Sequence, residues 1–139
     1  MSNNVHYSKI LVEALKAIGI AAVVNAVLFF VLFAAKMIDP HVGVGPANDP
    51  IHVGAVVMST VVFLAIATAI FLLLARFTSN PARIFTWVCA IGFVLLLANP
   101  FLMIQNIPTS MGIAVDLLHV APAYLIWRFL TRAVDYTRI

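Results

Sequence analysis

Charged residues are scarce in this chain. They make up 9% of its 139 residues, whereas hydrophobic residues make up 64%. Soluble domains carry about 25% charged residues. The composition therefore excludes an ordinary soluble domain and predicts an integral membrane protein.

Cysteine is almost absent, because Cys89 is the only one in the chain. A single cysteine excludes an internal disulfide and every metal motif built from several cysteines. The four histidines keep a metal or haem enzyme open, but they form no HExxH or paired-histidine helix motif. A haem held by two histidines would require His119 and a distant partner. The sequence assigns no catalytic residue, no metal site and no cofactor.

The chain contains long apolar runs. They cover about residues 17–35, 51–75, 82–104 and 110–128. About 20 residues at roughly 1.5 Å rise cross a hydrocarbon core of about 30 Å. The runs predict a single four-span domain over residues 1–139, with the all-α fold of an integral membrane four-helix bundle.

The connections carry turn and capping signals. Residues 36–51 are rich in glycine and Asp-Pro pairs, which favour turns. A capping side chain accepts from the free amides of the first turn, where a following proline needs no donor. This pattern predicts caps at Asp49 before Pro50, at Asn80 before Pro81, and at Thr109 or Ser110.

Small residues at four-residue spacing allow helices to approach closely. In the first span such a stripe contains Ala17, Ala21 and Asn25, flanked by Ala22 and Ala26. In the second span the pairs are Ala55 with Ser59 and Ala65 with Ala69. One stripe can close the monomer and leave another for a partner, so we expect a homo-oligomer or a larger membrane complex within the lipid bilayer.

Basic residues lie at the ends of the spans rather than in a patch with aromatic residues, which argues against a nucleic-acid partner. Of the eight Lys and Arg residues, only Lys36 falls on the side of the long connection. Positively charged residues favour the cytoplasmic side of a membrane. The distribution predicts a multi-pass membrane protein with both termini cytoplasmic.

Asp116 and His119 interrupt the last span with ionisable side chains. Residues three apart share a helix face, so the two side chains can meet. Asp116 falls at roughly the depth of Ser59, Thr60 and Asn99, about 8 to 12 Å below the outer boundary, and His119 and Asn25 fall near the midplane. We predict that these residues face a polar pocket in the outer half of the bundle, and that the pocket forms a ligand or proton site.

Two prolines add acceptors to this region. A proline within a helix leaves the carbonyl four residues earlier without its amide donor. Pro100 frees the carbonyl of Leu96 and introduces a kink or an early helix end, and Pro122 frees the carbonyl of Leu118. Both carbonyls are extra acceptors for a water molecule, a ligand or an ion.

The same polar residues have a structural interpretation. Asn, Ser and Thr side chains commonly form hydrogen bonds between membrane helices. Asp116 and His119 can equally form a structural pair. Under either interpretation Asp116→Leu should destabilise the fold by leaving His119 without a partner. The sequence leaves the functional and the structural interpretation open.

Two functions follow from the polar pocket. The first is a non-enzymatic membrane module that binds a small or apolar ligand, or a partner subunit. The second is a small proton- or cation-coupled transporter working as a dimer, for which a membrane-embedded acid is the minimum requirement. Substrate-dependent proton flux abolished by Asp116→Asn distinguishes the transporter from the module.

Residues 76–85, with the sequence RFTSNPARIF, precede a proline late in the third span and Leu118-His119-Val120 in the fourth. In these features the chain resembles a family of small four-span bacterial membrane proteins with no assigned function. The likeness runs from about His52 to the end of the chain. It implies a bacterial plasma (inner) membrane and the position of the histidine, and it supplies no catalytic roles.

Overall fold

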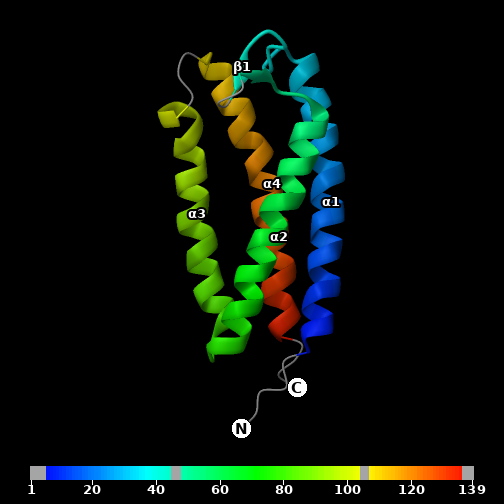
Figure 1. The fold of residues 1–139 in the computed structure, drawn as a ribbon, viewed down its shortest axis with the longest axis vertical. Coiled ribbons are helices and arrows are strands. Elements are labelled where there is room, and N and C mark those ends of the chain that lie inside the picture. Colours follow the sequence, from blue (N-terminus) through cyan, green and yellow to red (C-terminus); the bar gives the residue numbers. More distant parts are fainter. Residues whose placement is uncertain (1–5, 45–47, 104–106, 136–139) are drawn as a thin grey trace.

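Four long helices form the protein in the computed structural model, which describes residues 6–44, 48–103 and 107–135 (Figure 1). The helices are α1 (Tyr7–Ala34), α2 (Val53–Phe77), α3 (Pro81–Met103) and α4 (Thr109–Asp135), and the strands are β1 (Gly43–Val44) and β2 (Asp49–Pro50). All four helices are long and apolar enough to cross a membrane. The predicted all-α, multi-pass four-helix bundle is confirmed.

Helix α4 is the centre of the bundle. It contacts each of the other three helices, whereas α1 and α3 do not contact each other in the described part of the chain. Figure 1 shows α2 and α3 meeting at their short connection and diverging toward the end that carries the β1–β2 hairpin. The space between α2 and α3 therefore widens toward the hairpin.

Two apolar clusters form the core. One includes Ala17, Ala21, Phe71 and Phe85, and the other includes Phe29, Val56, Ala114 and Leu118. Along α1, Asn25 lies between Ala21 of the first cluster and Phe29 of the second. Its side chain is 2% exposed, so a polar group separates the two clusters.

The stripe of small residues predicted on the first span is buried, with Ala17 and Ala21 both 0% exposed. The small pairs predicted on the second span do not pack inside the monomer. Ala55, Ser59, Ala65 and Ala69 are exposed, and α2 buries instead the row of Val56, Thr60, Leu64, Thr68, Phe71 and Ala75. Most side chains of this row are larger than alanine and serine, so they make more packing contacts with the neighbouring helices. Thr60 and Thr68 satisfy their hydroxyl groups by donating to carbonyls of their own helix.

Helix α1 ends in a turn that satisfies its last carbonyls. The amide of Lys36 donates to Phe33 O at 3.0 Å, and the amide of Met37 donates to Leu32 O at 3.0 Å. This is the Schellman pattern, with Lys36 at φ 58° in the position that glycine usually takes. The helix therefore stops before the long connection.

The prediction that Asp49 caps α2 is wrong. His52 is the N-cap, and its Nδ1 accepts from the amide of Ala55 at 3.1 Å. Asp49 and Pro50 instead form β2, in which Asp49 pairs with Val44 and Pro50 pairs with Gly43. The imidazole of His52 supplies the acceptor that the carboxylate of Asp49 was expected to supply.

The other helix starts lie close to their predicted places. Helix α3 begins at Pro81, as predicted, and continues past Pro100 rather than ending there. At α4 the carbonyl of Pro108 accepts from the amides of Met111 and Gly112, so the first helical bond begins one residue before the predicted cap at Thr109 or Ser110.

Candidate functional site

Asn25 ties three helices together near the middle of the bundle. Its Nδ2 donates to Thr60 Oγ1 on α2 at 2.9 Å and to the carbonyl of Leu118 on α4 at 2.8 Å. A backbone carbonyl only accepts, so the contact with Leu118 fixes which end of the amide is the nitrogen. Both amide hydrogens are used in holding α2 and α4 against α1.

Pro122 explains why the carbonyl of Leu118 is available to Asn25. Pro122 lies inside α4 and has no amide hydrogen to donate to the residue four positions earlier. Asn25 supplies the missing donor from a neighbouring helix. This is the repair that membrane helices use for proline, since no water is present to hydrate a freed carbonyl.

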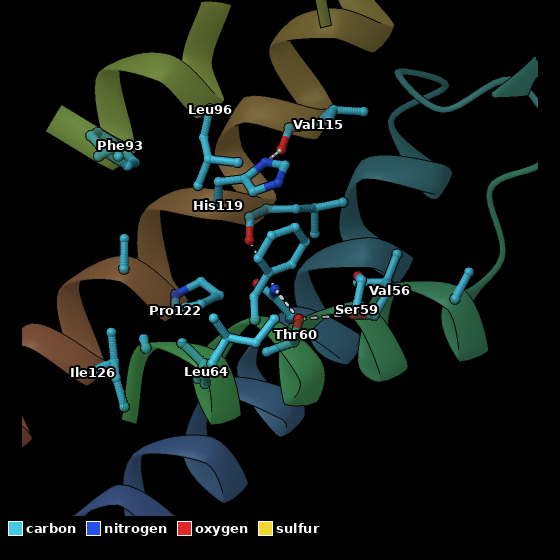
Figure 2. Close-up of a pocket in the computed structure, with 18 of the residues that line it drawn as sticks. Val56, Ser59, Thr60, Leu64, Phe93, Leu96, Val115, His119, Pro122 and Ile126 are labelled. Carbon is cyan, nitrogen blue, oxygen red and sulfur yellow. Dashed lines mark hydrogen bonds between the residues drawn. The ribbon is translucent and has the colours of Figure 1, made fainter. Parts of the chain in front are cut away.

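A cavity of about 640 Å³ lies beside this junction. Asn25 lines it from α1. Thr60 lines it from α2, and His119 lines it from α4 (Figure 2). Most of the remaining wall is apolar and comes from α2, α3 and α4; it includes Phe63, Leu64, Ile66, Ile70, Phe85, Val88, Phe93, Leu96, Pro122 and Ile126. Drug-sized ligands occupy cavities of about 300 to 1,000 Å³.

The cavity opens sideways between α2 and α3. Phe63 and Ile66 of α2 line it and are 51% and 53% exposed, and Val88 of α3 lines it and is 39% exposed. This opening coincides with the divergence of the two helices in Figure 1. Asp49 and His52 line the cavity at the end nearest the hairpin.

Two hydrogen-bond acceptors remain at the polar wall. Oδ1 of Asn25 is buried and has no partner among the described residues. His119 Nδ1 lies 2.7 Å from the carbonyl of Val115, which can only accept, so Nδ1 carries the proton. In the neutral ring Nε2 is then an acceptor, and no described residue donates to it.

The hydroxyls at the cavity bond to their own helix. Thr60 Oγ1 donates to Val56 O at 2.8 Å, and Ser59 Oγ donates to the same carbonyl at 3.0 Å. Each hydroxyl hydrogen is therefore already used. Of the six residues predicted to form a site, the structure brings Asn25, Ser59, Thr60 and His119 to one cavity.

Asp116 and Asn99 do not line this cavity. The side chain of Asn99 is exposed, and Oδ1 of Asp116 is buried without a partner. No hydrogen bond or ion pair joins Asp116 to His119, both of which the structure describes, because the Nδ1 proton of His119 goes to Val115 O. The expected hydrogen bond between Asp116 and His119 is therefore not formed, although the two side chains lie close enough to interact electrostatically.

From α3 the sequence predicted only Asn99, and it missed the apolar wall that this helix supplies through Phe85, Val88, Cys89, Gly92, Phe93 and Leu96. A weak signal was present. Gly92 is a small residue within an otherwise bulky span, and it lies along the lining face between Cys89 and Leu96. Apolar residues of a membrane helix look alike in sequence whether they face lipid or a cavity.

Asp39 and His52, which could in principle bind a metal ion, have local structural roles. Asp39 Oδ1 accepts from the amide of His41 at 2.8 Å, which is a local turn, and His52 caps α2. Within the described ranges no three His, Cys, Asp or Glu residues lie together in a way that could hold a metal ion.

Comparison with known proteins gives one match. The family of unknown function DUF6069 matches residues 7–136, which include the first span and the long connection as well as the segment that resembles such a family by its motifs. No curated protein and no solved structure matches the chain.

Proposed function

We propose that this chain, which belongs to the DUF6069 family of unknown function, is a non-enzymatic membrane module that binds an uncharged amphiphile in the cavity beside Asn25. The apolar tail of the ligand lies between α2 and α3, and its hydroxyl head donates to Asn25 Oδ1 and His119 Nε2. The observation that carries the proposal is the unpartnered, fully buried Oδ1 of Asn25.

The apolar part of the ligand follows from the walls and the opening. In a membrane, an opening between α2 and α3 faces lipid, because both helices are long enough to span the bilayer. A ligand can enter from the bilayer without crossing the hairpin. Its tail then exchanges lipid contacts for contacts with Phe63, Ile66 and Phe93, so the tail gives little selectivity.

The polar part of the ligand follows from the acceptors. A buried acceptor without a donor costs about 1 to 3 kcal/mol, which a ligand hydroxyl recovers when it donates. Asn25 Oδ1 and His119 Nε2 are both acceptors that receive no hydrogen bond from a described residue. No Lys or Arg is among the residues that line the cavity, so a carboxylate or phosphate head would enter without a counter-charge.

Binding of tritiated 1-monooleoylglycerol to the purified protein in mild detergent tests this assignment. The compound combines one oleoyl chain with two hydroxyl donors, and methyl oleate and oleate are competitors with the same chain but no hydroxyl donor. We expect methyl oleate and oleate to compete at least about tenfold less well, because one lost hydrogen bond of about 1.4 kcal/mol corresponds to a factor of ten.

His119→Leu is the matched variant for this experiment. It removes the Nε2 acceptor, whereas the carbonyl of Val115 keeps the helical bond from residue 119. We expect affinity for 1-monooleoylglycerol to fall about tenfold and affinity for methyl oleate to stay the same. Val120→Leu, at a neighbouring position that is 45% exposed, is the control and should bind as the wild type does. Equal binding of the three oleoyl compounds would contradict the proposal.

We also propose that both termini lie in the cytoplasm of a cell whose plasma membrane holds the protein. In the structure, the start of α1, the end of α4 and the α2–α3 connection share one end of the bundle (Figure 1). The single Lys36 lies at the other end, beyond α1. Retention of positive charge on the cytoplasmic side supports this orientation.

Cysteine labelling tests the orientation. In a Cys89→Ala background, Ser79→Cys should react with a membrane-impermeant maleimide only after the cells are permeabilised. His41→Cys, in the connection at the other end, should react in intact cells. Labelling of position 79 and not position 41 in intact cells would reverse the orientation.

A further inference from the structure

A second cleft lies between α1 and α4, at the end of the bundle opposite the hairpin. Its volume is about 390 Å³, and it is lined by Lys9 and Glu13 of α1 and by Arg128, Phe129, Arg132 and Ala133 of α4. None of these residues lines the cavity beside Asn25. The two sites are therefore separate.

The charge of this cleft is positive. Lys9, Arg128 and Arg132 supply three cationic side chains, against the single carboxylate of Glu13. That carboxylate is already paired, because Lys16 Nζ donates to Glu13 Oε1 at 2.7 Å. Lys16 is not part of the lining, so the charged residues of the cleft and its edge carry a net positive charge.

The cleft lies at the depth where lipid headgroups occur. Arg132 is in the last turn of α4, and Lys9 is in the first turn of α1. Tyr124 and Trp127 of α4 pack against each other with ring centroids 6.0 Å apart, and the guanidinium of Arg128 lies 6.0 Å from the Tyr124 ring. Tyrosine and tryptophan side chains favour the membrane–water interface.

We propose that this cleft binds the phosphate of an anionic phospholipid. Arginine guanidinium groups present a planar fork of donors that matches phosphate oxygens, and basic pockets between membrane helices bind anionic headgroups. Phe129 and Ala133 give the cleft an apolar wall. This wall suits a phosphate that carries acyl chains rather than free phosphate.

Native mass spectrometry of the protein in mild detergent tests the proposal by titration with dioleoyl phosphatidylglycerol, dioleoyl phosphatidylcholine and inorganic phosphate. We expect the anionic lipid to bind more tightly than the zwitterionic lipid with the same chains. In Arg128→Gln/Arg132→Gln, affinity for phosphatidylglycerol should fall about 30-fold, because each cation near the membrane surface contributes about a factor of five.

Arg76→Gln/Arg83→Gln is the matched control. It removes the same charge from the same end of the bundle, but neither residue lines the cleft. The control should keep the affinity of the wild type. Equal losses of affinity in the two double variants would mean that general surface charge attracts the lipid, and the proposed site would be wrong. Equal binding of the anionic and the zwitterionic lipid by the wild type would also contradict it.

Inorganic phosphate distinguishes the source of the phosphate. If it bound as tightly as phosphatidylglycerol and lost affinity in the cleft variant alone, the site would belong to a soluble phosphate and the lipid assignment would be wrong. Folding of the cleft variant is checked by its binding of 1-monooleoylglycerol, which depends on the other cavity.

Discussion

Asn25→Leu is expected to lower the free energy of unfolding by about 1 kcal/mol, because it removes two hydrogen bonds between membrane helices that contribute about 0.6 kcal/mol each. The variant also leaves the carbonyl of Leu118 without a donor, but this cost of about 1 to 3 kcal/mol is offset by removal of the unpartnered Oδ1 of Asn25. The side chain is buried and donates to both Thr60 Oγ1 and Leu118 O. Leucine has the same branching as asparagine but no donor. The measurement is unfolding by SDS titration in mixed micelles.

A second substitution tests the physical reason. Pro122→Ala restores an amide at position 122, which can donate to the carbonyl of Leu118 within α4. Asn25→Leu should then cost less in the Pro122→Ala background, with a coupling of about 1 kcal/mol between the two sites. The double-mutant cycle thus isolates the bond from Asn25 to Leu118 from the bond to Thr60.

Val27→Leu on α1 is the control, since Val27 is 60% exposed and its change should stay within about 0.5 kcal/mol. Additive effects of Asn25→Leu and Pro122→Ala would show that the two positions do not share the carbonyl of Leu118. A stable Asn25→Leu variant would remove the view that this residue holds three helices together.

The four helices could be predicted because lipid imposes a strong rule. Each span must bond its own backbone and must be apolar for about 20 residues, and the four runs of this chain satisfy both conditions. Local signals were less decisive. Asp49 was predicted to cap α2, but it pairs in the β1–β2 hairpin. The helix therefore begins later, and His52 supplies the acceptor for the free amide of Ala55.

The polar site was only partly predictable. Counting residues placed Thr60 in the outer half of the bundle and Asn25 and His119 near its midplane, and Pro122 pointed to the free carbonyl of Leu118. Depth alone gives no rotation about the helix axis. Asp116 therefore falls outside the cavity that His119 lines, although the two residues are only three positions apart.

Asp116 and His119 also form no hydrogen bond with each other because His119 bonds to a different group. The expected bond between Asp116 and His119 had to compete with the carbonyl of Val115, one turn before His119 on the same helix. Bonds of this kind within one helix require no particular packing of neighbouring helices. His119 therefore keeps its cavity-facing nitrogen for another group, and Asp116 stays unpaired on Oδ1.

Asp116→Leu is accordingly expected to raise the free energy of unfolding, by about 1 to 3 kcal/mol, which is the cost of a buried polar atom without a partner. This reverses the expectation from the sequence, in which leucine would leave His119 without its partner. His119 donates to Val115 O in the structure, so that loss does not occur. SDS titration in mixed micelles again gives the measurement.

Asp116→Asn is the matched variant, because it keeps the shape and a polar atom and should change stability less than Asp116→Leu does. Both variants should bind 1-monooleoylglycerol as the wild type does, since Asp116 is not among the residues that line the cavity. A loss of stability in Asp116→Leu would show that the carboxyl group has a partner in the membrane.

Substrate-dependent proton flux in vesicles that disappears in Asp116→Asn would favour the proton-coupled transporter over the binding module, because only a transporter requires this carboxyl group to exchange a proton.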